Sequence, residues 1–253
     1  MGITLIPPFM NNLTKTGLFI IALLCGSIPS LAGENPTQMK ELKVKKITAG
    51  SVEASTVPVL MDKENVSFQA IDVVNWDAYP YRPDVSFRIA YTDHAILLHY
   101  KVKEKSVRGH YGKDDDPVYT DSCVEFFISP AGDEVYYNFE CNCVGTILQG
   151  GGKPGDRDRA TPAIMNRIDR WASLGRTPFE ERTDVNEWEV ALVIPFTTFY
   201  KHDITSLQGK AIRANFYKCG DELATPHFLS WNPIPVKKPN FHLPEYFGML
   251  LFE

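Results

Sequence analysis

The sequence lacks an excess of positive charge, and beyond residue 32 it lacks any long helical pattern of apolar residues. It contains 26 Lys and Arg against 31 Asp and Glu residues, a formal net charge of −5, and its longest run of like charge is Asp114–Asp116. A nucleic-acid-binding surface normally carries a basic patch, so the composition argues against a nucleic-acid partner. The missing helical periodicity argues against all-α and α/β folds.

Motifs for phosphate and zinc binding are also missing. Gly150–Gly152 and Lys153 lack the Gly-Lys-Ser/Thr ending of a phosphate loop, and we expect a mobile surface loop there. The cysteine spacing fits no zinc module. Alternation along the strands places Cys123 on a polar face and Cys141 and Cys143 on a core face, so Cys123 cannot bridge to either. We therefore expect free thiols.

The N-terminal region contains the only long apolar run, Gly17–Ala32. It is too short for a comfortable membrane span and matches the apolar region of a signal peptide, with Ser30-Leu31-Ala32 as the cleavage pattern. We therefore predict a signal peptide over residues 1–32, no membrane span, and an exported protein that is periplasmic, surface-bound or secreted. The alternative is a lipoprotein anchored at Cys25. Residues 33–55 are polar and predict a flexible leader.

The rest of the chain shows short alternating segments separated by turn residues. A hairpin is predicted from Val85–Tyr91 and Ala95–Val102, with His99 pointing away from the core as a surface residue. Thr56–Leu60 is expected to be an edge strand, since Pro58 fits an edge. Further strands are expected in the segments Trp188–Ile194, Gln208–Cys219 and Phe247–Phe252. This pattern predicts an all-β fold, an antiparallel β-sandwich or jelly roll, as one domain over residues 56–253.

The most informative stretch is Asp121–Gly145, which predicts two strands joined by the turn Ser129–Asp133. Alternation places Glu125 on the opposite face from the apolar side chains of the first strand. The second strand has a core face and a polar face. The core face carries Tyr137, Phe139, Cys141 and Cys143, and the polar face carries Asn138, Glu140 and Asn142. The registers that keep both apolar faces inward place Glu125 beside or within one pair of Asn138, with Glu140 as a diagonal neighbour.

A second polar set, Arg213, Asn215 and Tyr217, alternates with apolar residues on a later strand. If both sets share a sheet, they form one surface with carboxylate, amide and guanidinium groups. Sugar hydroxyls donate and accept hydrogen bonds, so such a surface complements them. A sugar also needs an aromatic platform, and the candidates are Tyr119, Trp76, Trp171 and Trp231. The alternative is a solvated sheet face with no ligand.

Several of these segments together resemble carbohydrate-binding module family 9 and its stand-alone bacterial relatives, from about Val57 to Glu253. The resemblance lies in Asp121–Ile128, Tyr137–Glu140, Trp188–Pro195, Arg213–Lys218, Ser230–Pro233 and Phe247–Gly248. It implies a β-sandwich that binds sugars, in the better-known members at a reducing end. The implied site is a slot between two rings, with a Glu, an Arg and amides bonding the hydroxyls.

Carried over by residue, the resemblance implies that the glutamate is Glu125 and that one ring is Trp231. Tyr119 stands where the family has its other ring. The position of the family's arginine holds Asn138 or Glu140 instead, and Arg213 is the candidate substitute. Some relatives bind structural calcium, for which Asp114–Asp116 and Asp121 are the candidates.

We therefore predict non-catalytic carbohydrate binding by an exported protein that serves polysaccharide breakdown or capture. The alternative is a glycoside hydrolase using Glu125 and Glu140, because neighbouring strands bring carboxylates to hydrolase spacings of roughly 5–9.5 Å. A haem domain would need a His or Met ligand, and neither polar set contains one. The predicted ligand-binding residues are Tyr119, Glu125, Asn138, Glu140, Asn142, Arg213, Asn215, Tyr217 and Trp231.

Overall fold

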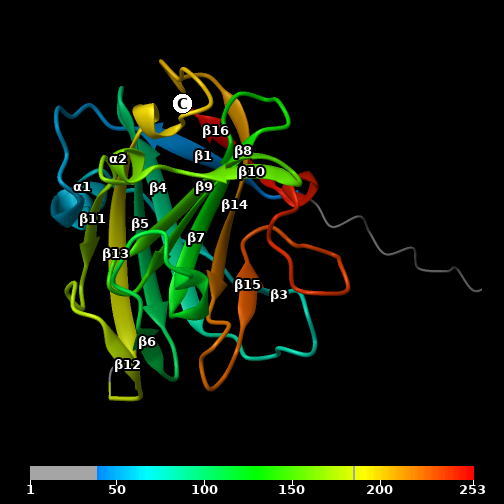
Figure 1. Cartoon of the computed structure of the whole chain (residues 1–253). Helices are drawn as coiled ribbons and strands as arrows, with labels where there is room; N and C mark the ends of the chain where they lie inside the picture. The colour runs from blue at the N-terminus through cyan, green and yellow to red at the C-terminus, as the bar shows by residue number, and fades with distance from the viewer. Residues whose placement is uncertain (1–38, 185) are drawn as a thin grey trace, which may run out of the picture. The chain divides into compact units, whose positions relative to one another are not determined.

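The computed structural model describes residues 39–184 and 186–253, which form a sandwich of two β-sheets (Figure 1). The first sheet has the order β10 (Asp156–Arg159), β9 (Ile147–Lys153), β8 (Tyr136–Asn142), β7 (Cys123–Ser129), β14 (Ala211–Cys219), β16 (Gly248–Phe252) and β1 (Glu41–Lys46). The second continues from β1 through β4 (Asp84–Tyr91), β5 (Ala95–Lys103), β13 (Glu187–Pro195) and β11 (Asp169–Ala172). The predicted all-β sandwich is thus confirmed.

Short elements complete the fold. The strands are β2 (Gln69–Ala70), β3 (Val73–Val74), β6 (Val107–Gly109), β12 (Phe179–Arg182) and β15 (Phe228–Ser230). The helices are α1 (Val57–Lys63) and α2 (Pro162–Met165), with single 3-10 turns at Ala54–Thr56, Val118–Thr120, Phe196–Thr198 and Pro244–Tyr246. No helix among the described residues is long and apolar enough to cross a membrane. The predicted signal peptide and the Cys25 anchor lie outside the described residues.

Strand β1 connects the two sheets. Residues 41–44 pair in parallel with β16, and Lys45 and Lys46 pair in parallel with β4. The expectation of a flexible leader over residues 33–55 is wrong for this segment. Leu42 and Val44 alternate with charged residues, and Val44 is fully buried. The high Lys content hid a strand whose apolar side chains are few but correctly spaced.

The main core fills the space between the sheets, and the predicted faces of the central strands are correct. Val124, Phe126 and Ile128 of β7 point into this core, as do the alternate residues Tyr137, Phe139 and Cys141 of β8 and Ile212, Ala214 and Phe216 of β14. Phe87 on β4 stacks against Phe216 on β14, with ring centroids 3.6 Å apart. This contact joins the two sheets at their centre.

Two local expectations were wrong. Thr56–Leu60, expected to be an edge strand, instead leads into α1, whose Val57 and Met61 are one helical turn apart and fully buried. This helix covers the outer face of the second sheet, where it packs against Ala90 of β4 and Leu97 of β5. His99 is therefore not a surface residue. It is fully buried and bonds to the Glu189 carboxylate at 2.7 Å.

The outer face of the first sheet is also covered. A second apolar cluster packs there, formed by side chains of the sheet and of the segments around residues 76–79 and 228–247. Trp76 anchors these segments to each other by donating its indole N–H to the Val236 carbonyl at 2.8 Å. The polar residues of β7, β8 and β14 therefore lie under a second layer of chain rather than on an open surface.

Candidate functional site

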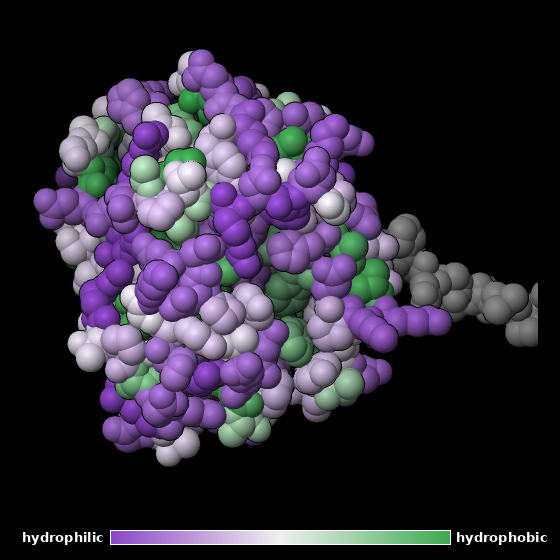
Figure 2. Space-filling view, viewed as in Figure 1, coloured by the Kyte–Doolittle hydropathy of each residue, from purple (hydrophilic) through white to green (hydrophobic). Residues whose placement is uncertain are grey.

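A pocket of about 960 Å³ opens between the outer face of the first sheet and the segments that cover it. Ligand pockets commonly have volumes of about 300–1,000 Å³. Figure 2 shows a hollow with hydrophobic residues inside it and hydrophilic residues around it. The residues that line the pocket include Tyr79, Tyr119, Glu125, Asn138, Glu140, Gly150, Arg157, Arg159, Cys219, Asp221, Phe228 and Phe241.

Two glutamates form the floor of the pocket. Glu125 on β7 pairs directly with Glu140 on β8, and Asn138 pairs with Phe127. Asn138 is one pair away from Glu125, within the expected range, but Glu140 is the direct neighbour of Glu125 and not the expected diagonal one. Glu125 and Glu140 are only 3% and 4% exposed. Two carboxyl groups this close and this dry cannot both ionise without a large free-energy cost.

Burial raises the pKa of Glu140 to about 7, against the lowering effect of a hydrogen bond from Asn138. Burial and the neighbouring charge of Glu140 raise the pKa of Glu125 well above its ordinary value. Asp221 on the wall also has a pKa raised by burial, to about 6. The floor therefore keeps at least one carboxyl protonated near neutral pH, which gives the pocket both a proton donor and carboxylate acceptors.

The two oxygens of the Glu140 carboxyl differ in their surroundings. Oε1 accepts a hydrogen bond from Asn138 Nδ2 at 2.9 Å. Oε2 is buried and has no hydrogen-bond partner among the described residues. A buried polar atom without a partner costs about 1–3 kcal/mol, so a ligand that donates to Oε2 would recover that free energy.

The guanidinium group of Arg157, on β10, fixes the orientation of the Asn138 side chain. Arg157 on β10 lies over the Tyr136 ring at 3.6 Å and donates to Asn138 Oδ1. The Asn138 amide is therefore oriented so that its nitrogen faces Glu140. Gly150 makes room for this contact, since a Cβ there would lie 2.8 Å from Asn138 Oδ1.

Arg157 and Arg159 were not predicted at the site, because the glycine run from Gly150 indicated a mobile loop there. The segment instead forms the hairpin of β9 and β10. The signal was available in Asp156–Arg159, where Asp and Arg alternate and place both arginines on one face. Both line the pocket.

Of the predicted aromatic platforms, only Tyr119 lines the pocket, and it is 38% exposed. Trp231 is instead 3% exposed in the main core, edge-on to Phe87 and Phe216. Trp76 is buried, and Trp171 belongs to β11 of the other sheet. Tyr79, Phe228 and Phe241 were not predicted, and they supply the other rings of the pocket.

Four further predicted residues do not line the pocket. Asn215 is buried and donates to the Asn232 carbonyl at 3.0 Å, and Tyr217 is buried against Phe241 with ring centroids 4.2 Å apart. Arg213 lies farther along β14, where it donates to the Glu245 carbonyl at 2.7 Å. All three lie on the predicted face of β14. Arg213 is too far along the strand to reach the pocket, and Asn215 and Tyr217 are covered by the second layer of chain.

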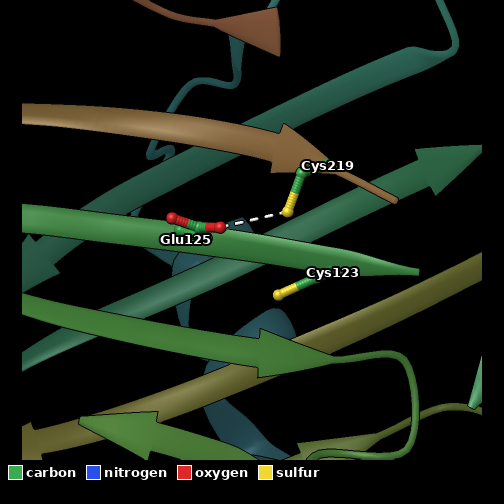
Figure 3. A group of neighbouring side chains, drawn as sticks. All are labelled: Cys123, Glu125 and Cys219. Atoms are coloured by element: carbon green, nitrogen blue, oxygen red, sulfur yellow. Dashed lines mark hydrogen bonds between the residues drawn. The ribbon is translucent and has the colours of Figure 1, made fainter. Parts of the chain in front are cut away.

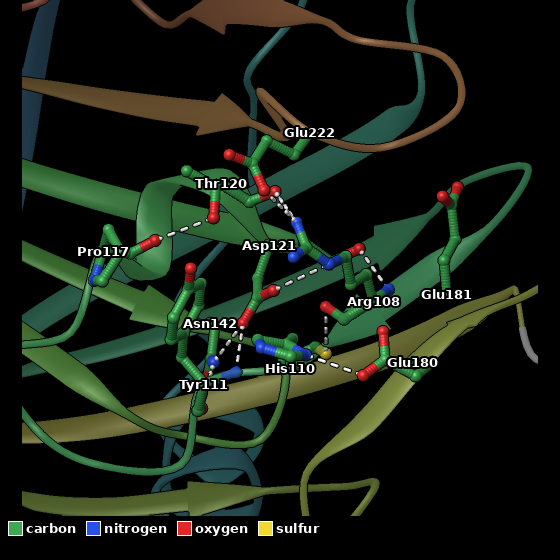
Figure 4. A network of polar contacts seen from close by, with 12 residues as sticks. Arg108, His110, Tyr111, Pro117, Thr120, Asp121, Asn142, Glu180, Glu181 and Glu222 are labelled. Carbon is green, nitrogen blue, oxygen red and sulfur yellow. Dashed lines mark hydrogen bonds and ion pairs between the residues drawn. The ribbon is translucent and has the colours of Figure 1, made fainter.

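Asn142, the fourth, belongs to a separate buried network around Asp121 (Figure 4). It donates to Asp121 Oδ2 at 2.9 Å and to the Tyr111 carbonyl at 2.8 Å. Arg108 lies 3.5 Å from the other carboxylate oxygen of Asp121 and 3.0 Å from Glu222. This network holds the loop before β7 against the end of β8, and so fixes the position of Tyr119 beside the pocket.

The sequence matches the model of carbohydrate-binding family 9 over residues 55–252. The chain belongs to carbohydrate-binding family 9. Among solved structures, it is 51% identical to a protein from Bacteroides uniformis ATCC 8492 that has been assigned a carbohydrate-binding role. That match has a TM-score of 0.83 and covers 85% of this chain and 100% of that chain.

Two structures of a family 9 module from Caldicellulosiruptor kristjanssonii share the fold at 12% identity. The complex with glucose has a TM-score of 0.55 and covers 85% of this chain and 96% of the module. The complex with cellotriose has a TM-score of 0.56 and covers 85% of this chain and 94% of the module. The comparison with curated proteins gives no match.

The structure changes how the features expected of family 9 map onto this chain. Glu125 and Tyr119 lie at one pocket, as the resemblance implies, whereas Trp231 and Arg213 do not. Arg157 and Arg159 bring the guanidinium groups to the pocket from β10 instead. Whether these residues contact a sugar stays a prediction.

Three of the four carboxylates considered for calcium, those of Asp114, Asp115 and Asp121, face an arginine. Both oxygens of Asp114 accept from Arg170, at 2.7 and 2.8 Å. Asp115 lies 3.6 Å from Arg159, and Asp121 faces Arg108. Calcium needs six to eight convergent oxygens. Carboxylates that are neutralised by separate arginines do not provide such a set, so the residues present do not fit calcium.

Proposed function

We propose that this family 9 chain binds a carbohydrate, without catalysis, in the pocket over Glu125 and Glu140. The observation that carries the proposal is the buried Oε2 of Glu140, which has no partner among the described residues and lies at the floor of a pocket with an exposed Tyr119. A sugar hydroxyl satisfies the oxygen, and the apolar face of the sugar ring packs on the tyrosine.

The remaining wall groups suit a neutral sugar. Arg159 is exposed at the rim and offers donors to ring or hydroxyl oxygens. Protonated Glu125 offers a donor, and ionised Glu140 offers an acceptor. One sugar hydroxyl can therefore accept a hydrogen bond from Glu125 while a neighbouring hydroxyl donates one to Glu140. We propose glucose-containing oligosaccharides as ligands, because the Caldicellulosiruptor kristjanssonii module was solved with glucose and with cellotriose.

The cellular role follows from the same proposal. The apolar segment Gly17–Ala32 supports export, and a sugar-binding protein outside the cytoplasm would serve capture or breakdown of polysaccharide. Mass spectrometry of the chain purified from its native host tests export, since cleavage after Ala32 leaves Gly33 as the first residue.

Isothermal titration calorimetry with glucose, cellotriose and a panel of other neutral sugars tests binding. We expect heat with at least one glucose-containing ligand, and a loss of affinity of about tenfold or more for Glu140→Gln, since a hydrogen bond to a charged group contributes about 1.5–3 kcal/mol. Glu134→Gln is the matched control, because Glu134 is exposed on the turn before β8. Absence of heat with every sugar would contradict the proposal.

One observation favours hydrolysis as a second function. Glu125 and Glu140 face each other and burial raises the pKa of both, so one can hold a proton while the other is ionised, as an acid and a carboxylate partner do. Incubation with cellotriose and measurement of new reducing ends tests this. Cleavage that disappears in Glu125→Gln would establish that the protein is an enzyme, whereas binding without cleavage supports non-catalytic carbohydrate binding.

A further inference from the structure

A cluster of two thiols and a carboxyl lies at the pocket floor beside Glu140. Cys123 on β7 pairs directly with Cys219 on β14, and Glu125 is two residues along β7 on the same face. Their sulfur and oxygen atoms all lie within 4.8 Å of one another (Figure 3). Within the described ranges, these residues form the only such group of His, Cys, Asp and Glu side chains.

All three side chains are shielded from bulk water. Cys123, Cys219 and Glu125 are 0%, 1% and 3% exposed. The Cys219 thiol donates to Glu125 Oε1 at 3.0 Å, and Cys219 also lines the pocket. The first sheet therefore closes the cluster on one side, and the pocket lies on the opposite side.

The neighbouring thiols have no comparable arrangement. Cys141 and Cys143 project into the main core on the other face of the sheet, among apolar residues. All four cysteines are free and buried. The sheet thus separates one pair of thiols that lies beside a carboxyl from a second pair that does not.

The donor set suits a borderline-soft divalent ion. Zinc binds thiolate sulfur at about 2.3 Å and carboxylate oxygen at about 2.0–2.2 Å, so its ligand atoms lie about 3.5–3.8 Å apart in a tetrahedron. The three ligand atoms lie within 4.8 Å of one another, so they need to approach by about 1 Å to bind one zinc ion. Three protein ligands leave one position for a water or a ligand oxygen, as in open zinc sites.

We propose that Cys123 Sγ, Cys219 Sγ and the Glu125 carboxylate bind one zinc-class cation, with its fourth position open to the pocket. The ion displaces the two thiol protons and the Glu125 proton to solvent, forming two metal–sulfur bonds and one metal–oxygen bond with no change of oxidation state. Binding therefore strengthens as pH rises. The proposal does not depend on sugar binding, although a bound ion would present its open position to the same ligand.

The test is a titration of the full, metal-free chain with Co²⁺ at pH 8 under a non-thiol reductant, followed by displacement with Zn²⁺. We expect one Co²⁺ per chain, a thiolate-to-cobalt charge-transfer absorption, and its loss on adding Zn²⁺. Cys123→Ser and Cys219→Ser should weaken binding by more than the roughly 10–100-fold that loss of a partner to a metal ligand costs. Cys141→Ser, a buried thiol on the other face, should bind as the wild type does.

A measurement on the wild type keeps the proposal testable if the serine variants fail to fold. Native mass spectrometry should show one zinc ion per chain. The mass of the complex should equal that of the metal-free chain plus zinc, less two or three displaced protons. Absence of the charge-transfer band overturns the proposal, as does equal loss of binding in Cys141→Ser. A wild-type chain that is two hydrogens lighter, with Cys123 bonded to Cys219, and that binds no metal after reduction also overturns it.

Discussion

Replacing Glu140 by Gln should make the protein more stable at high pH, because the buried carboxyl is costly there. The pKa of Glu140 is raised from 4.5 to about 7 by burial. The folded state therefore holds this proton more tightly than the unfolded state, and the stability contributed by the group is complete below about pH 4.5. It falls as pH rises from there through about 7.

The magnitude follows from the size of the shift. Each pKa unit corresponds to 1.36 kcal/mol, so a rise from 4.5 to about 7 costs about 3 kcal/mol of unfolding free energy above pH 7. Gln does not titrate, and its carbonyl still accepts the hydrogen bond that Glu140 Oε1 receives from Asn138. Removing the charge of Glu140 also lowers the pKa of Glu125, which adds to the stabilisation.

Urea denaturation of both proteins at intervals between pH 4.5 and 8.5 measures this effect. We expect nearly equal stability at pH 4.5 and a variant that is more stable by about 3 kcal/mol or more at pH 8. Glu134→Gln is the control, because Glu134 pairs with Lys153 at 2.9 Å on the exposed turn and such pairs contribute about 1 kcal/mol or less. A difference that stays constant with pH would refute the reasoning.

Three further substitutions separate residues of the pocket from residues of the core. Tyr119→Ala should abolish sugar binding in calorimetry with an unchanged melting temperature, since Tyr119 is 38% exposed; retained affinity would remove it from the site. Trp231→Ala should instead lower the unfolding free energy by about 3–5 kcal/mol in urea, because the side chain is buried in the core, and wild-type stability would contradict that placement. Lys218→Met should cost about 3–5 kcal/mol by leaving the buried Glu104, 2.9 Å from Lys218 Nζ, without its cation. Changing Glu104 to Leu in the same chain should restore much of this loss in thermal melts, and a further loss would count against the pair.

The sequence predicts the faces of the central strands well because alternation is a local property. Glu125, Asn138 and Glu140 lie on the predicted face and line one pocket. Their exact neighbours depend on register, which is set by packing of whole strands, and so Glu140 rather than Asn138 is opposite Glu125.

What could not be predicted lies where distant segments meet. Trp231 stands in a Pro-rich stretch, and its contacts with Phe87 and Phe216, which are distant in the sequence, show that it is a core residue. Arg157 reaches Asn138 because β10 folds back beside β9. Composition gives no indication of such contacts, and the same holds for the second layer that buries Asn215.

The position of β1 has a consequence for how the chain folds. Its residues lie between β16, which ends at Phe252, and β4, so neither sheet is complete until the two ends of residues 41–252 have met. Contacts between such distant segments are slow to form because a long loop must close first. During synthesis, β1 is made before all the strands that lie between it and β16, and it must remain unpaired with β16 until those strands have also been made.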